Sequence, residues 1–66
     1  MAILKVLEIM ASSQKGWEDA AQIAVTEASE TVRNIRSINI KNFSAEVSNG
    51  KITEWRINSK ITFEVE

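Results

Sequence analysis

The dipeptide Asn49-Gly50, between two long runs of strand-forming residues, is the feature that most restricts how this chain can fold. Asn-Gly favours the tight two-residue turn that joins antiparallel strands, because both central residues of that turn need positive φ. The turn predicts a hairpin whose register follows from its first pair. Continued without interruption, that register predicts these pairs: Ser48 with Lys51, Val47 with Ile52, Ala45 with Glu54, Phe43 with Arg56, Ile40 with Ser59 and Ile38 with Ile61.

The first strand of this hairpin changes the side on which its apolar residues lie. Even positions are apolar first and odd positions afterwards: Ile38 and Ile40, then Phe43, Ala45 and Val47. Successive side chains of a strand alternate between its faces, so an uninterrupted strand would place the two groups on opposite faces. We favour the interpretation that the second group contacts another subunit. The alternative is a β-bulge near residues 41–42, which would rotate Phe43 back toward the core.

Residues 17–34 have the spacing of a helix with one apolar face. The residues of that face are Trp17, Ala20, Ala21, Ala24, Val25, Ala28 and Val32. Most are alanine, so the helix can lie close to a sheet but buries little area. Ser12 or Ser13 is the expected N-terminal cap, and Asn34 is the expected left-handed stop.

Residues 2–10 form a short, mainly aliphatic run that predicts a further strand. The order β-α-β-β predicts a single α+β domain over residues 1–66, with a three-stranded antiparallel sheet whose third strand is central. One face of the sheet should be covered by the helix. Its expected residues are Ile38, Ile40, Trp55, Ile57, Ile61, Phe63 and Val65.

A chain of 66 residues is short for a self-sufficient hydrophobic core and commonly needs a further source of stability. The sequence has no cysteine and no histidine, which excludes disulfides and the usual zinc sites. Oligomerisation is the remaining means of stabilisation. We therefore expect the protomer to associate with copies of itself.

Several functional classes are disfavoured by composition. No Ser-His-Asp or Cys-His set and no glycine-rich phosphate loop can form, so we expect no enzyme. Eight basic and nine acidic residues are spread along the chain, which argues against a nucleic-acid partner. No apolar run is long enough for a membrane span. The charged residues Lys5 and Glu8 interrupt the apolar N-terminal stretch, which argues against a signal peptide. We expect a cytoplasmic protein.

Three stretches, LKVLEIMASSQKGWEDAAQIAVTEASETVRNIRS, NGKITEWRI and ITFEVE, together resemble the dodecins over essentially the whole chain. The resemblance implies a protomer whose sheet partly wraps round its helix, assembled as a hollow homododecamer of 23 symmetry. Many dodecins bind flavins such as FMN and riboflavin, and their role is storage or protection without catalysis. The flavin rings stack between symmetry-related tryptophans of the second strand, and a glutamine of the third strand hydrogen-bonds to the ring.

In this sequence the tryptophan position of the family falls on Ser37 and the glutamine position on Arg56. A hydroxymethyl group offers no stacking surface, and stacking on an aromatic side chain contributes about 1–3 kcal/mol per contact. We therefore expect the flavin-type site to be present by position but weak. The chain is similar to the dodecins that lack this platform, such as calcium-binding members, although no motif assigns ligands to an ion.

Our main hypothesis is a dodecin-like shell that stores or sequesters a small ligand. The alternative is a cation-binding, specifically calcium-binding, or purely structural assembly without flavin, in which carboxylates of several subunits meet at symmetry axes. A third class, an adaptor that adds a strand to a partner at an open sheet edge, has less support.

Overall fold

A computed structural model of the chain describes residues 2–65, which form one helix and three strands. The order is β1 (Ile3–Ser13), α1 (Trp17–Ser29), β2 (Ile35–Ser48) and β3 (Lys51–Val65). The strands lie in the order β1-β3-β2, and β3 is antiparallel to both neighbours. The predicted β-α-β-β fold with a central third strand is confirmed.

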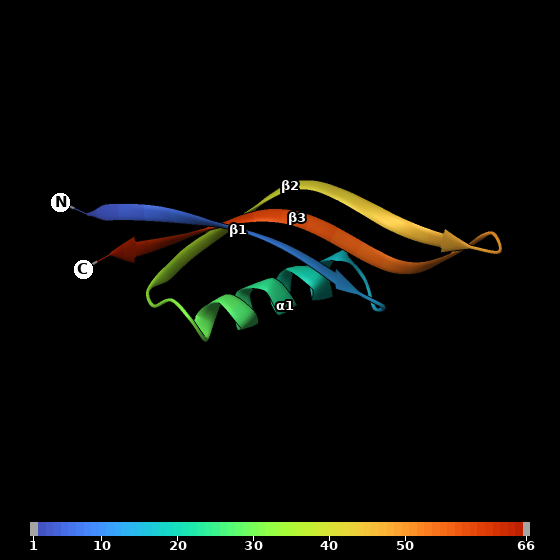
Figure 1. The fold of residues 1–66 in the computed structure, drawn as a ribbon, viewed down its shortest axis with the longest axis horizontal. Helices are drawn as coiled ribbons and strands as arrows, with labels where there is room; N and C mark the ends of the chain where they lie inside the picture. The colour runs from blue at the N-terminus through green and yellow to red at the C-terminus, as the bar shows by residue number, and fades with distance from the viewer. Residues whose placement is uncertain (1, 66) are drawn as a thin grey trace.

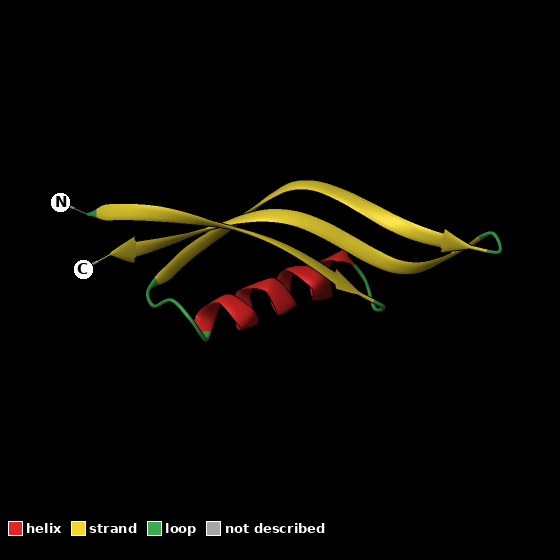
Figure 2. Cartoon of the chain, in the orientation of Figure 1, coloured by secondary structure: helices red, strands yellow, loops and turns green. Residues whose placement is uncertain are grey.

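The sheet is much longer than the helix that covers it. The molecule measures 51 × 19 × 13 Å, and Figure 1 shows both termini at one end and the β2–β3 turn at the other. Figure 2 shows α1 under the middle of the sheet, with the hairpin tip projecting beyond the start of the helix. The tip is therefore left without cover from its own chain.

The core is a thin layer between α1 and β3. Its buried apolar residues are Ala20, Ala24, Ala28, Ile57 and Ile61. Ser59 lies between the two isoleucines, is fully buried, and donates a hydrogen bond from Oγ to the carbonyl oxygen of Ile9 at 2.9 Å. The alternation of buried residues in β3 confirms which face of the sheet the helix covers.

The helix prediction was wrong at the C-terminal end, because α1 ends at Ser29. The carbonyl oxygen of Ala28 accepts hydrogen bonds from the backbone N–H groups of Thr31 and Val32, at 3.0 and 2.9 Å. Two successive β-branched residues lose side-chain freedom in a helix, which disfavours its continuation. Asn34 does adopt the left-handed region, with φ of 60°, but within the crossover to β2.

The predicted serine cap was also wrong. Ser12 and Ser13 are the last residues of β1, and the N-cap of α1 is Gly16 without a side-chain hydrogen bond. The hydroxyl of Ser13 instead accepts a hydrogen bond from Lys15 N at 2.9 Å and donates one to Asp19 Oδ2 at 2.6 Å. Ser13 thus ties the connecting turn to the first turn of the helix.

Three irregularities interrupt the β2–β3 pairing, and two of them form a matched pair. Thr53 of β3 and Lys41 of β2 are extra residues at β-bulges, and the Thr53 hydroxyl donates to the carbonyl oxygen of Glu46 at 3.3 Å.

Between the bulges the register is displaced by one residue, so two predicted pairs were wrong: Phe43 faces Ile57 and Ala45 faces Trp55. Outside the bulges four predicted pairs are confirmed: Ser48 with Lys51, Val47 with Ile52, Ile40 with Ser59 and Ile38 with Ile61.

The bulge at Lys41 places Phe43 on the side of the sheet that carries α1. The Phe43 ring meets Trp17 edge to face, with centroids 5.7 Å apart, and Trp17 Nε1 donates to the carbonyl oxygen of Ser44 at 3.1 Å. The favoured assignment of Phe43 to the opposite face was therefore wrong, and the bulge alternative is confirmed. Phe43 is nevertheless 58% exposed, because α1 begins at Trp17 and does not extend over the tip.

Large apolar side chains remain exposed on both faces and at the tip. They are Ile3, Leu4, Val6, Met10, Trp17, Ile23, Phe43, Val47 and Ile52. Some of them are neighbours, since Val47 pairs with Ile52 and Phe43 contacts Trp17. Adjacent exposed apolar side chains of this kind commonly mark a protein–protein contact. Together with the thin core, this supports the expectation that copies of the chain cover one another. The contact of Phe43 and Val47 with another subunit stays a prediction.

We expect Ile61→Ala to lower the free energy of unfolding by about 2–5 kcal/mol per protomer, because Ile61 is fully buried and its loss leaves a cavity. Denaturant unfolding of the assembled protein, followed by circular dichroism, measures the change. Ile61→Val is the matched control and should cost about 0.5–1.5 kcal/mol. Equal costs for the two variants would contradict the assigned core.

Candidate functional site

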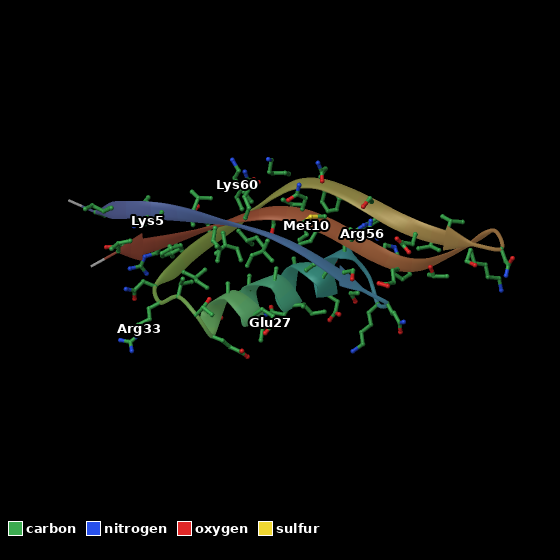
Figure 3. All side chains as sticks on the ribbon, viewed as in Figure 1. Lys5, Met10, Glu27, Arg33, Arg56 and Lys60 are labelled. Carbon is green, nitrogen blue, oxygen red and sulfur yellow. The ribbon has the colours of Figure 1, made fainter. Side chains whose placement is uncertain are left out.

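The face of the sheet opposite α1, which we call the open face, carries both positions that the sequence analysis singled out. Its residues in β3 are Glu54, Arg56, Asn58, Lys60, Thr62 and Glu64. Figure 3 shows Lys60 on the side of the sheet away from the helix, whereas Glu27 extends from the helix itself. The open face is thus mainly polar along its central strand.

Three ion pairs form between the strands around this face. Arg36 Nη2 lies 2.8 Å from Glu64 Oε1, Lys41 Nζ lies 3.5 Å from Glu8 Oε2, and Arg56 Nη2 contacts Glu46 Oε2. The pairs connect β2 to β3 twice and β2 to β1 once. They neutralise most of the charge on the open face without leaving a strong field of either sign.

Ser37 lies directly after the irregularity at Arg36 and pairs with Thr62 of β3. Thr62 in turn pairs with Val6 of β1, so the residues around Ser37 are small or aliphatic. Ser37 is exposed and contributes one hydroxyl to this row. No residue of the row supplies an aromatic surface on which a planar ring could stack.

Arg56 lies far from Ser37 on the same face. It pairs with Ser12 and Ser44, whereas Ser37 pairs with Thr62, six positions further along β3. At a rise of about 3.3 Å per residue, the two sites are roughly 20 Å apart. One protomer therefore cannot bring Ser37 and Arg56 to the same ligand, and a site using both needs residues of different protomers.

Beside Arg56 the surface has a shallow hollow of about 150 Å³, lined by Met10, Ala11, Ser12 and Arg56. The guanidinium of Arg56 is engaged by the carboxylate of Glu46. Arg56 has donors only, so it cannot accept a hydrogen bond from a ring N–H as a glutamine carbonyl can. Glu46 was not among the residues expected at this site. A register that allowed for the bulge at Thr53 would have placed it diagonally across from Arg56 on the same face.

The described residues do not form a metal site by themselves. Within residues 2–65 no group of three or more carboxylate, histidine or cysteine side chains is close enough to hold an ion. Glu46 and Glu54 face each other across β2 and β3, but Glu46 also binds Arg56. Calcium takes six to eight oxygen ligands, so any calcium site needs donors beyond one protomer or from water.

The Dodecin family profile matches residues 3–66 of the chain. The chain belongs to the dodecin family. Among curated relatives, calcium dodecin of Mycobacterium tuberculosis is 38% identical over 98% of this chain and 92% of the relative. Dodecins are non-enzymatic ligand-binding proteins that form homododecamers, so the expectation that the protein is not an enzyme is confirmed at the level of the family.

Solved dodecin structures agree with this fold. A Thermus thermophilus protein, tt0972, superposes with a TM-score of 0.94 at 23% identity, over 100% of this chain and 97% of its own. Dodecin from Streptomyces coelicolor superposes with a TM-score of 0.92 at 26% identity, over 98% of this chain and 93% of its own. The M. tuberculosis calcium dodecin superposes with a TM-score of 0.82 at 32% identity, over 97% of this chain and 91% of its own. That protein is described as calcium-chelating, with a novel calcium-binding site.

No helix within residues 2–65 is long and apolar enough to span a bilayer.

We expect Glu46→Gln to change the free energy of unfolding by less than about 1 kcal/mol. Both side chains of its ion pair with Arg56 are solvent-exposed, at 56% and 36%, and surface pairs contribute little. Thermal unfolding at low and high salt measures the effect. Comparison of Glu46→Gln, Arg56→Gln and the double variant E46Q/R56Q separates the pair's own contribution from that of each charge. A loss of several kcal/mol would show that the pair is shielded in the assembly.

Proposed function

We propose that this protein is a homododecameric shell of 23 symmetry that binds calcium and does not bind flavin tightly. The observation that carries the proposal is its 38% identity, over nearly the full chain, to a protein named calcium dodecin. This is the cation-binding alternative of the sequence analysis, and it is better supported than flavin storage. The single domain over residues 1–66 would supply one twelfth of the shell.

The chemistry of the open face supports the same choice. Ser37 stands where the stacking tryptophan of flavin-binding dodecins is expected, and its row contains no aromatic residue. Arg56 stands at the expected glutamine position and is held by Glu46. Both contacts that a flavin ring would use are thus replaced by groups that cannot supply them.

A cation site shared between protomers suits the distribution of acids in the chain. Within residues 2–65, Glu46 and Glu54 are the carboxylates that face each other on the open face, and two are too few for a calcium ion. A rotation axis repeats each carboxylate around one point. The proposed site is therefore a property of the assembly, with oxygen ligands from more than one copy.

We expect calcium to bind the assembled protein saturably in isothermal titration calorimetry and to raise its melting temperature. At a free concentration of 100 times Kd, a ligand specific for the folded state adds about 2.7 kcal/mol per site. A chelator should reverse the shift, and magnesium should give a smaller one. If calcium produced no binding heat and no change in melting temperature, the cation proposal would be refuted and only a purely structural assembly would remain.

Carboxylate-to-amide variants then locate the ligands. Glu8→Gln, Glu46→Gln, Glu54→Gln and Glu64→Gln test the acids around the open face, and Glu27→Gln on the helix is the control. Every copy around a symmetry axis carries the same substitution, so a shared site would lose more than one carboxylate ligand. Substitution of a ligand should therefore reduce calcium affinity at least tenfold. Unchanged affinity in all four variants would place the site away from the open face.

We expect riboflavin and FMN to show no submicromolar fluorescence quenching with the unchanged protein, because Ser37 provides no stacking surface. Ser37→Trp should raise flavin affinity roughly five- to 150-fold, as expected for a stacking contact of about 1–3 kcal/mol. Asn39→Trp, two positions along β2 and on the same face, is the matched control. Submicromolar binding before any substitution would contradict the assignment of Ser37.

A further inference from the structure

An apolar groove lies between the C-terminal half of α1 and the crossover into β2, on the side of the sheet that carries the helix. Its volume is about 550 Å³. The lining residues are Val25, Ser29, Val32, Arg33, Asn34 and Ile35. The volume falls within the range of small-ligand sites, about 300–1,000 Å³, although the groove is shallow and open to solvent along its length. The groove shares no lining residue with the calcium or flavin positions considered above.

The lining of the groove is largely apolar. Val25, Val32 and Ile35 are half-buried, pack against the core, and leave part of their surface to solvent. The hydroxyl of Ser29 donates to the carbonyl oxygen of Val25 at 2.6 Å, so it is already satisfied within the helix. A ligand in the groove would therefore meet mainly hydrocarbon along its length.

The groove is held by hydrogen bonds at both ends of the crossover. The carbonyl oxygen of Ala28 accepts from Thr31 N, Val32 N and Thr31 Oγ1 at 3.0, 2.9 and 3.2 Å. The carbonyl oxygen of Asn34 accepts from Glu64 N at 3.0 Å. Backbone and hydroxyl donors thus satisfy the Ala28 carbonyl at the C-terminal end of the helix. Arg33, a few residues further on, is not needed for this.

The rim of the groove carries positive charge. Within residues 2–65 Arg33 makes no ion pair, whereas Arg36, three residues later, binds Glu64. Figure 3 shows Arg33 at this end of the molecule with its side chain extended into solvent. Lys5 also makes no ion pair within residues 2–65. It pairs across the sheet with Phe63, and Phe63 pairs on its other side with Ile35 of the groove. Lys5 therefore lies two strands, or about 10 Å, from the floor of the groove.

We propose that this groove binds a small amphipathic carboxylate, with its hydrocarbon chain along Val25, Val32 and Ile35 and its head group on Arg33. A guanidinium binds a carboxylate through two parallel hydrogen bonds, which fixes the orientation of the ligand. Lys5 adds a second positive charge at the same end of the sheet. The required ligand combines one negative head with an apolar chain, and either part alone fits only half of the groove.

The test uses octanoate as the probe and the assembled protein, followed by NMR or calorimetric titration. Octanoate should bind saturably, whereas acetate, which lacks the chain, and octanol, which lacks the charge, should bind at least tenfold more weakly. Arg33→Gln should weaken octanoate binding at least tenfold. Arg36→Gln is the matched control, because it removes a nearby exposed arginine that is engaged on the opposite face by Glu64.

Equal octanoate affinity in the Arg33→Gln and unchanged proteins would overturn the proposal, as would the absence of saturable binding. Light scattering on the same samples tests another occupant of the groove, a second copy of the chain. A smaller particle after Arg33→Gln would identify the groove as a subunit contact and would also overturn the proposal. Calcium binding should be unaffected by this variant, so the two proposals can fail separately.

Discussion

The close approach of an alanine-lined helix to the central strand is the contact on which the rest of the structure depends. Ala20, Ala24 and Ala28 lie over Ile57 and Ile61, and these five residues form the entire buried apolar core of the described chain. Small side chains bring the helix near the sheet but remove little apolar surface from water. The protomer therefore keeps much of its hydrocarbon at the surface, and association with copies follows from this shortage of core.

The two faces of the sheet carry different features. The helix side holds the core and a groove with an apolar floor and a cationic rim, whereas the open face holds ion pairs together with Ser37 and Arg56, the two positions at which the family resemblance places the flavin contacts. Ser37 and Arg56 lie about 20 Å apart along β3. A small ligand that contacts both residues would therefore have to lie between protomers. Both residues are outside the buried core, so substitutions at these positions should disturb the fold little.

Local signals in the sequence predicted the elements well and their ends less well. The Asn49-Gly50 turn and the alanine stripe are as expected, because they follow from local backbone preference and side-chain periodicity. The strand order is as expected because it follows from the crossover through the helix and the short β2–β3 hairpin. The predicted helix cap was Ser12 or Ser13, but a serine can equally bond within a turn, and tertiary pairing with Arg56 and Trp55 extends β1 through these residues. The position of Glu46 beside Arg56 could not be predicted, since it depends on the bulge at Thr53 in the partner strand.

The bulges at Lys41 and Thr53 compensate each other. Each inserts one residue, but in opposite strands, so the pairing before the first and after the second follows one common register. Only the segment between the bulges, residues 42–46 of β2 with 54–58 of β3, pairs one residue out of step with the rest of the hairpin. Because Lys41 and Thr53 each lack a cross-strand partner, deletion of either residue would remove its own bulge and leave the neighbouring pairs and their faces unchanged. Related sequences can therefore lose one bulge, and the local bend that it causes, independently of the other.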